Sequence, residues 1–134
     1  MTLALDSNMI IHLIHGTESV RMEYRNTHLQ GISIMIPPYV DYEICKGLYY
    51  VKASAKLRSY QNICRICDIG EMNRNIWRCA ANLYSDLRRK GFMVSDADIL
   101  IAAFCMENGC TLVTNNTKDF ANIEGLTLTD WLIL

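Results

Sequence analysis

Short apolar runs alternate along the chain with longer segments in which apolar residues recur every three or four positions. The short runs predict strands, and the longer segments predict helices that bury one face. The predicted strands are 3–5, 32–36, 66–69, 111–114 and 126–128. The predicted helices are 8–15, 18–29, a segment that starts at Pro38 and runs with a break towards Cys64, 73–90 and 95–107. Strands that alternate with helices predict an α/β sandwich with a central parallel sheet of four to five strands.

The ends of several predicted helices carry residues that suit those positions. Gly16 follows the first helix and Gly91 follows the 73–90 helix, as expected where a left-handed residue ends a helix. Pro38 suits the first position of a helix. Ser95, followed three residues later by Asp98, has the pattern of a capping box. These signals support the element boundaries that the apolar spacing predicts.

The composition indicates one domain over residues 1–134. Of the 134 residues, 51% are hydrophobic and 20% are charged, which is ordinary for a globular protein. The longest apolar run, residues 99–106, is far shorter than the roughly 20 residues that a membrane span needs. No basic region precedes the apolar N-terminus, so a secretion signal is not expected. We therefore predict a cytoplasmic protein that does not contact a membrane.

Six cysteines are spread over the chain. Without a secretion signal, reduced thiols are expected rather than disulfides. Cys64 and Cys67 form a CxxC motif, but no second Cys or His pair stands at the spacing of a zinc finger. The cysteines are interpreted as small hydrophobic residues of the core.

Acidic residues from remote parts of the chain stand where predicted strands end or where the following helices begin. Such positions meet at the ligand-binding edge of a parallel sheet. Each acid has a structural alternative as a helix cap or a solvated residue. Together, however, clustered carboxylates repel unless a cation compensates them, and Mg²⁺ or Mn²⁺ is the natural partner for oxygen ligands. Such an ion suits phosphoryl chemistry. The four acids are Asp6, Glu43, Asp98 and Asp119, with Asp41 beside Glu43 as a possible substitute.

Four segments carry these acids in sequences that resemble PIN-domain ribonucleases, and more closely the VapC toxins of prokaryotic toxin–antitoxin pairs. They read LALDSN at 3–8, EICKG at 43–47, SDADILIAA at 95–103 and LVTNNTKDF at 112–120, followed by EGL at 124–126. The resemblance spans the whole chain, in order. It implies a PIN-like α/β/α sandwich with an acidic, metal-holding pocket.

The resemblance also implies a role for each position. Asp6 and Asp98 would be the principal ligands of Mg²⁺ or Mn²⁺, and Glu43 and Asp119 would complete the catalytic site. Supporting roles, such as an outer-shell carboxylate or a group that positions water or phosphate, fall on Asn8, Asp96, Thr114, Asn115 and Asn116. Asn116 stands where many PIN nucleases have Asp, which lowers the charge at the fourth corner. His12, His15 and His28 are interpreted as incidental.

The implied activity is hydrolysis of RNA phosphodiester bonds by a homodimer that a cognate antitoxin inhibits. Residues 8–29 and 39–65 are the expected groove and dimer surfaces, with an apolar-aromatic run at 49–51. Once the four site acids are set aside, Lys and Arg outnumber the remaining Asp and Glu. Arg88, Arg89 and Lys90 are candidates for phosphate binding, and their alternative is a solvated helix end.

Two other functions remain open at this point. The chain could be a PIN-domain RNA-processing nuclease outside toxin–antitoxin systems, and a small antitoxin reading frame directly upstream would discriminate against that. It could also be a non-catalytic RNA- or protein-binding module whose acids only cap helices. Metal-dependent cleavage of RNA would discriminate against that second alternative.

Overall fold

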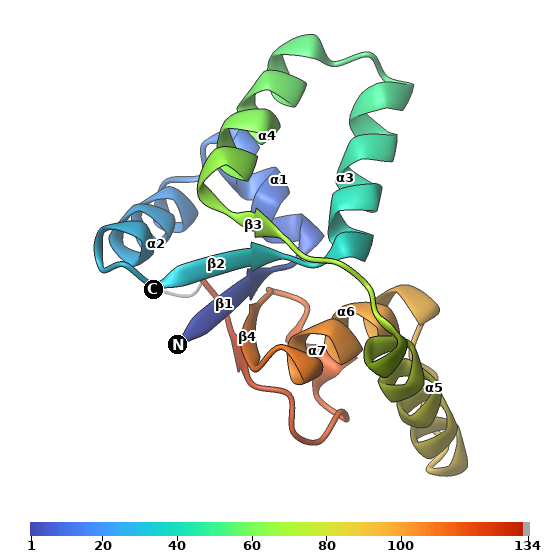
Figure 1. Cartoon of the computed structure of the whole chain (residues 1–134). Helices are drawn as coiled ribbons and strands as arrows, with labels where there is room; N and C mark the ends of the chain where they lie inside the picture. Colours follow the sequence, from blue (N-terminus) through green and yellow to red (C-terminus); the bar gives the residue numbers. More distant parts are fainter. Residues whose placement is uncertain (133–134) are drawn as a thin grey trace.

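One five-stranded sheet organises the protein, whose residues 1–132 are described by the structure, a computed structural model (Figure 1). The strand order is β3-β2-β1-β4-β5, and all four neighbouring pairs are parallel. β1 is central, with Leu3 opposite Ile34 of β2 and Thr111 of β4. The strands are β1 (Thr2–Leu5), β2 (Ser33–Ile36), β3 (Asp68–Ile69), β4 (Cys110–Val113) and β5 (Leu128–Thr129).

Helices cover both faces of this sheet. They are α1 (Ser7–His15), α2 (Glu18–Leu29), α3 (Pro38–Tyr50), α4 (Ser54–Ile66), α5 (Arg74–Arg89), α6 (Asp96–Glu107) and α7 (Thr117–Phe120). In Figure 1, α1 to α4 lie above the sheet, and α5, α6 and α7 lie below it. The predicted α/β/α sandwich with a parallel sheet is therefore confirmed.

The structure differs from the predicted elements mainly at short segments. The helical segment predicted from Pro38 towards Cys64 is interrupted by a turn at 51–53, where Lys52 has a φ of 52°. β3 and β5 have two residues each, so both are shorter than predicted, and β5 begins two positions later. The four-residue helix α7 was not predicted, because a single turn gives no apolar periodicity.

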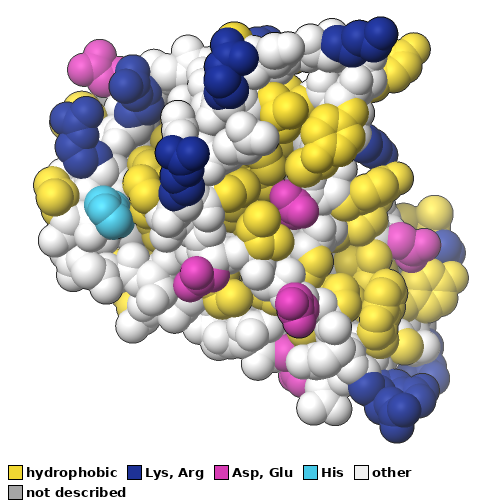
Figure 2. Space-filling model, turned by 45° about the horizontal axis from the view of Figure 1, so that its top comes forward, with side chains coloured by type: hydrophobic (Ala, Val, Ile, Leu, Met, Phe, Trp, Pro, Cys, Tyr) yellow, Lys and Arg dark blue, Asp and Glu magenta, His cyan; other side chains and the backbone are white. Residues whose placement is uncertain are grey.

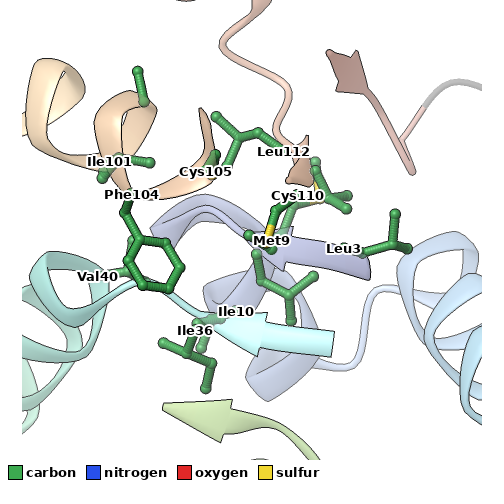
Figure 3. Close-up of a cluster of buried hydrophobic side chains, with 14 of the residues drawn as sticks. Leu3, Met9, Ile10, Ile36, Val40, Ile101, Phe104, Cys105, Cys110 and Leu112 are labelled. Carbon is green, nitrogen blue, oxygen red and sulfur yellow. The ribbon is translucent and has the colours of Figure 1, made fainter. Parts of the chain in front are cut away.

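The core lies on both sides of the sheet and includes α6, whose residues 101–105 are all buried. Figure 3 shows Phe104 of α6 pointing towards Val40 and Ile36, the first on α3 and the second on β2. Gly70, which follows β3, passes so close to this ring that a Cβ there would overlap Phe104. A side chain at position 70 would therefore displace Phe104.

The cysteines and Trp131 pack against the core, as predicted. All six cysteines are free thiols, and Cys67, Cys105 and Cys110 are buried. Trp131 is 5% exposed and joins the core, whereas positions 133–134 of the predicted apolar tail lie outside the described residues. Within residues 1–132, no helix combines the length and the apolar character needed to cross a membrane.

Candidate active site

Asp6 lies at the junction of β1 and α1, at the carboxyl edge of the sheet. It is the N-cap of α1, with φ −74° and ψ 160°, and its Oδ1 accepts a hydrogen bond from the Ser7 backbone N–H at 2.8 Å. The Asp6 backbone N–H donates to the Val113 carbonyl oxygen at 3.0 Å, which ties this residue to the end of β4. The Asp6 residue is only 6% exposed. The fold therefore holds a carboxylate largely out of bulk water.

Thr114, the first residue after β4, fixes the second oxygen of Asp6. It is fully buried, and its Oγ1 donates to Asp6 Oδ2 at 2.7 Å. The same hydroxyl accepts a hydrogen bond from the Asn116 backbone N–H at 3.0 Å. Each oxygen of Asp6 thus has a donor, one from α1 and one from the end of β4, so the orientation of the carboxylate is set from two sides.

Ser7 joins Asp6 to Glu43 on α3. Pro38 stands at the start of α3, directly after β2, and the helix brings Glu43 back over the end of β1. The Ser7 Oγ donates to Glu43 Oε1 at 2.7 Å, while the Ser7 backbone N–H is bonded to Asp6. One serine therefore holds the carboxylates that follow two neighbouring strands.

Asp98 lies in the first turn of α6, where Ser95 is the N-cap and its Oγ accepts from the Asp98 backbone N–H at 3.2 Å. Burial raises the pKa of Asp98 above 3.8, and the Ser95 side chain lowers it in part. The negative charges of Asp6, Asp119 and Glu43 then raise it further. Asp98 is therefore close enough to all three other predicted carboxylates to be repelled by each.

Asp6 is repelled by one of these acids, Asp119. Burial raises the pKa of Asp6, the hydrogen bonds from Thr114 and Ser7 lower it, and the charge of Asp119 raises it. Asp119 lies on α7 and is itself exposed. The four predicted acids, contributed by the ends of β1, β2 and β4 and by the start of α6, therefore form one electrostatic cluster. We call Asp6, Glu43, Asp98 and Asp119 the carboxylate cluster.

Within residues 1–132, no basic side chain forms an ion pair with the carboxylate cluster. The ion pairs within residues 1–132 are Arg89–Asp86 and Lys90–Glu124, and neither contains a cluster residue. Uncompensated, mutually repelling carboxylates are the donor set that a hard divalent cation such as Mg²⁺ or Mn²⁺ fits.

The spacing of the side chains limits how such an ion would be held. Among the described residues, no three His, Cys, Asp or Glu side chains converge closely enough to hold one ion together. Mg²⁺ commonly keeps several waters and uses only one or two protein carboxylates. The cluster therefore fits an ion that is bound by few direct ligands, and does not fit a closed protein cage.

Amide side chains lie at the exposed rim of the cluster. Asn8, on the first turn of α1, donates from Nδ2 to Asn115 Oδ1 at 3.4 Å, which bridges the loops after β1 and β4. Asn116 precedes α7 and is exposed, and its backbone N–H is bonded to Thr114. These side chains are exposed beside the cluster, and their supporting role stays a prediction.

The family model described as PIN domain matches residues 3–126. The chain belongs to the PIN-domain family. The match covers all four segments that carry the carboxylate cluster, so the kinship predicted from those segments is confirmed.

Curated relatives and solved structures agree with this placement. Ribonuclease VapC2 of Rickettsia felis is 26% identical over 140 residues, which cover 98% of each chain. Ribonuclease VapC1 of Haemophilus influenzae is 23% identical over 133 residues, again with 98% of each chain covered. Both are PIN-sized proteins that align with this chain from end to end.

Two solved structures illustrate the shared fold. The crystal structure of VapBC2 from Rickettsia felis bound to a DNA fragment from their promoter gives a TM-score of 0.90 at 24% identity, over 98% of this chain and 99% of that one. FitAcB from Neisseria gonorrhoeae gives 0.85 at 20% identity, over the full length of both chains. The PIN fold described here is thus the fold of both structures.

Other predicted residues of this PIN domain lie further from the cluster. Asp96 is exposed and lines a cavity with Trp77 and Tyr84 of α5, and it is not among the charges that raise the pKa of Asp98. An outer-shell role for Asp96 stays a prediction, and the structure gives it no contact with the cluster.

The three basic residues at the end of α5 make local contacts. The Arg88 guanidinium lies 5.2 Å from the centre of the Tyr84 ring, and Arg89 pairs with Asp86 at 3.4 Å. Lys90 lies 3.8 Å from Glu124, in the segment that leads into β5. A segment that leads into a parallel strand lies at the amino-terminal edge of the sheet, whereas the carboxylate cluster lies at the carboxyl edge. RNA bound by these three residues would therefore have to extend across the protein to reach the cluster.

Two remaining interpretations are settled by hydrogen bonds. Asp41 does not replace Glu43, because its Oδ1 accepts from the Tyr60 hydroxyl at 2.6 Å and from Cys45 Sγ at 3.5 Å, between α3 and α4. The His12 Nδ1 is bonded to Thr17 Oγ1 at 2.8 Å, at the end of α1. The contact of His12 with Thr17 agrees with the interpretation of this histidine as incidental to the site, whereas the suggested substitution of Asp41 for Glu43 was wrong.

Proposed function

We propose that this PIN domain is a metal-dependent endoribonuclease of the VapC type, which hydrolyses RNA phosphodiester bonds and is held inactive by a cognate antitoxin. The observation that carries the proposal is the carboxylate cluster. Four acids from remote segments lie at one edge of a PIN-fold sheet, where burial and the charges of Asp6, Asp119 and Glu43 raise the pKa of Asp98, and no basic residue is paired to the four within residues 1–132.

Asp6 and Asp98 would be the principal ligands of Mg²⁺ or Mn²⁺, because Asp6 is buried at the end of β1, Asp98 is partly buried in the first turn of α6, and both are repelled by like charges. When bound, such an ion polarises the phosphate, activates an attacking water and stabilises the leaving oxygen. Glu43 and Asp119 complete the site by holding water or orienting the nucleophile. The structural histidine of α1 has no part in this chemistry.

Hydroxyl and amide groups would keep the acids in position. Thr114 and Ser7 hold the two oxygens of Asp6, and Ser7 also holds Glu43. A carboxylate that is oriented before substrate arrives does not have to reorganise during the reaction. The side chains of Asn8, Asn115 and Asn116 can then donate to water or to the scissile phosphate from the exposed rim, with Asp96 in a more remote supporting role.

The proposed setting follows the relatives. Similar solved structures include a toxin-antitoxin complex from Klebsiella pneumoniae and DNA-bound VapBC from Salmonella typhimurium, which supports an antitoxin partner for this chain. We further propose a homodimer in the cytoplasm that acts on RNA and binds its phosphates in part through Arg88, Arg89 and Lys90. The exposed side chains of Tyr49, Tyr50 and Val51 offer apolar surface for protein contacts.

Cleavage of RNA by the purified chain, free of antitoxin, tests the proposal. RNA is incubated with Mg²⁺ or Mn²⁺ and either the natural chain or the Asp98→Asn variant, and the products are resolved on a denaturing gel. We expect metal-dependent cleavage by the natural chain and at least a 100-fold slower rate for the variant. Equal rates would mean that the activity is a contaminant or that Asp98 is not part of it.

A non-catalytic RNA-binding module is the second candidate. The wide spacing of the acids, among which no three described side chains converge, is the observation that favours it. RNA that is bound but never cleaved under any divalent metal would put this candidate ahead.

A further inference from the structure

An exposed aromatic stripe runs along α5, outside the carboxylate cluster. The helix packs its other side against α6, while Trp77 is 54% and Tyr84 is 43% exposed. Because residues four and then three positions apart share one face of a helix, Trp77, Ala81 and Tyr84 form a continuous line. We call these three residues the α5 stripe. Figure 2 shows hydrophobic side chains gathered at the right of the molecule, the side on which Figure 1 places α5.

A hollow of about 440 Å³ is lined by both aromatic side chains of the α5 stripe. Ala80 and Ala81 lie between these two residues in the sequence and also line the hollow, to which Ile99 and Leu100 of α6 add apolar walls. Asp96, which is exposed at the start of α6, lines it too. The hollow therefore combines apolar and aromatic surface with one negative charge.

The sequence of the stripe is the same at both ends. Residues 77–84 read WRCAANLY, with an aromatic residue at each end and two alanines in the middle. If two copies of α5 pair antiparallel about the midpoint of Ala80 and Ala81, Trp77 of each copy meets Tyr84 of the other. A two-fold contact requires this reciprocity, and aromatic pairs stabilise such contacts beyond the area they bury. The α5 stripe is thus complementary to itself.

Charges at the two ends of the stripe agree with the same pairing. Arg74 lies one turn before Trp77, and Asp96 lines the hollow beside Tyr84. Within residues 1–132, neither takes part in an ion pair, and the antiparallel arrangement brings Arg74 of one copy towards Asp96 of the other. RNA fits this surface less well, because Asp96 would repel a phosphate placed in the hollow.

We propose that the α5 stripe is the contact between two copies of this chain, paired antiparallel about the midpoint of Ala80 and Ala81. This inference deepens the homodimer of the proposed function and rests on that part of it, not on RNA cleavage. It places the dimer contact outside segments 8–29 and 39–65, so their exposed apolar surface stays available to an antitoxin. Since Asp96 stands two positions before Asp98, the contact would also hold the start of the helix that carries this site acid.

Sedimentation equilibrium of the antitoxin-free chain tests the contact, because it gives the mass and the dissociation constant of the dimer. Ala81→Arg places a long cation at the two-fold axis. Ala55→Arg is the matched control, because both alanines are exposed on helices and arginine favours helices nearly as well as alanine does. We expect a dimer for the natural chain, a dissociation constant at least about thirtyfold higher for Ala81→Arg, and a change of less than about twofold for Ala55→Arg.

A disulfide locates the axis without weakening the contact. In Ala81→Cys, the introduced thiols of two copies lie next to the axis, and mild oxidation with diamide, which takes up the two hydrogens, should join them into a covalent dimer. The natural chain, with its six cysteines, and Ala55→Cys should stay single chains on a non-reducing gel. Asp96→Arg should weaken the dimer several-fold, and Arg74→Asp in the same chain should restore it.

A natural chain that sediments as a monomer would overturn the inference and the proposed homodimer together, whatever its activity on RNA. A dimer that Ala81→Arg leaves intact, or equal cross-linking of the Ala81→Cys and Ala55→Cys chains, would overturn this contact and leave the homodimer standing. If Ala81→Arg changes RNA affinity but not mass, the α5 stripe binds RNA and the inference fails. If the natural chain does not cleave RNA but dimerises as described, the proposed activity fails and the contact stands.

Discussion

Replacing Thr114 by valine removes a single hydroxyl from the buried support of Asp6. Valine has nearly the same shape, so the change leaves the packing behind β4 in place. The Asp6 Oδ2 loses the donor at 2.7 Å, and the Asn116 backbone N–H loses its acceptor at 3.0 Å. Because Thr114 is fully buried, water does not readily replace either bond.

The size of the effect follows from the charge of the acceptor. A hydrogen bond to a charged group contributes about 1.5–3 kcal/mol, so the free energy of unfolding at pH 7 should fall by about that amount. This bond lowers the pKa of Asp6, so it is stronger with the ionised form. The pKa of Asp6 should therefore rise in the variant, and the difference in stability should shrink at a pH low enough to protonate Asp6.

Urea unfolding at pH 7 and pH 3 measures the loss of stability and its dependence on pH. RNA cleavage as a function of Mg²⁺ concentration measures the effect on metal binding. Loss of support to a ligand commonly weakens metal affinity or activity about 10–100-fold, so half-maximal cleavage should need correspondingly more Mg²⁺. Thr114→Ser is the matched control, because it keeps the hydroxyl and loses only a methyl group. If the valine and serine variants have the same stability and the same Mg²⁺ dependence, the assigned role of Thr114 is refuted.

Three further changes test other parts of the account. Asp98→Asn should raise the melting temperature by about 3 °C at pH 7 without metal, because burial and like charges raise the pKa of Asp98. The ionised form of Asp98 thus opposes folding. The gain in melting temperature should vanish below pH 3.8, the ordinary pKa of this carboxyl. A lower melting temperature of the variant at pH 7 would contradict this explanation. Ser7→Ala should slow single-turnover cleavage about tenfold by releasing Glu43. Ser7→Thr keeps the hydroxyl and should cleave at the natural rate. Equal rates for the alanine and threonine variants would show that the hydroxyl has no such role. The double change Arg88→Ala/Arg89→Ala should flatten the salt dependence of RNA affinity by up to about two in log–log slope, and an unchanged slope removes both residues from the RNA footprint.

The positions of the four acids were predictable because of one rule of parallel sheets. Apolar runs located the strands, and whatever follows such strands shares one edge of the sheet. Asp6, Glu43 and Asp119 follow strands and were found in this way, whereas Asp98 was found at the start of the predicted 95–107 helix. The pKa of Asp98 responds to the charges of the other three. The resemblance of the surrounding motifs then favoured a metal-dependent nuclease over a set of helix caps.

Contacts that depend on helix rotation and on side-chain reach were not predictable. Asp41 and Glu43 are two positions apart on α3, so they project from different faces, and only the packing of α4 shows that Asp41 meets Tyr60. Likewise, the resemblance implied a groove over residues 8–29 and 39–65, but only the structure shows that Ile11, Ile44 and Leu48 line one there. The direct link from Ser7 to Glu43 needs two helices to be placed in three dimensions.

Titration of the antitoxin-free chain with Mn²⁺, followed by electron paramagnetic resonance of the free ion, tests most directly whether the carboxylate cluster is a metal site. Asp6→Asn is the decisive variant, because asparagine keeps the helix cap and removes only the charge. The account predicts that the natural chain takes up Mn²⁺ and that the variant binds it at least tenfold more weakly, with RNA cleavage lost in parallel. Equal Mn²⁺ uptake by both chains would contradict the central claim.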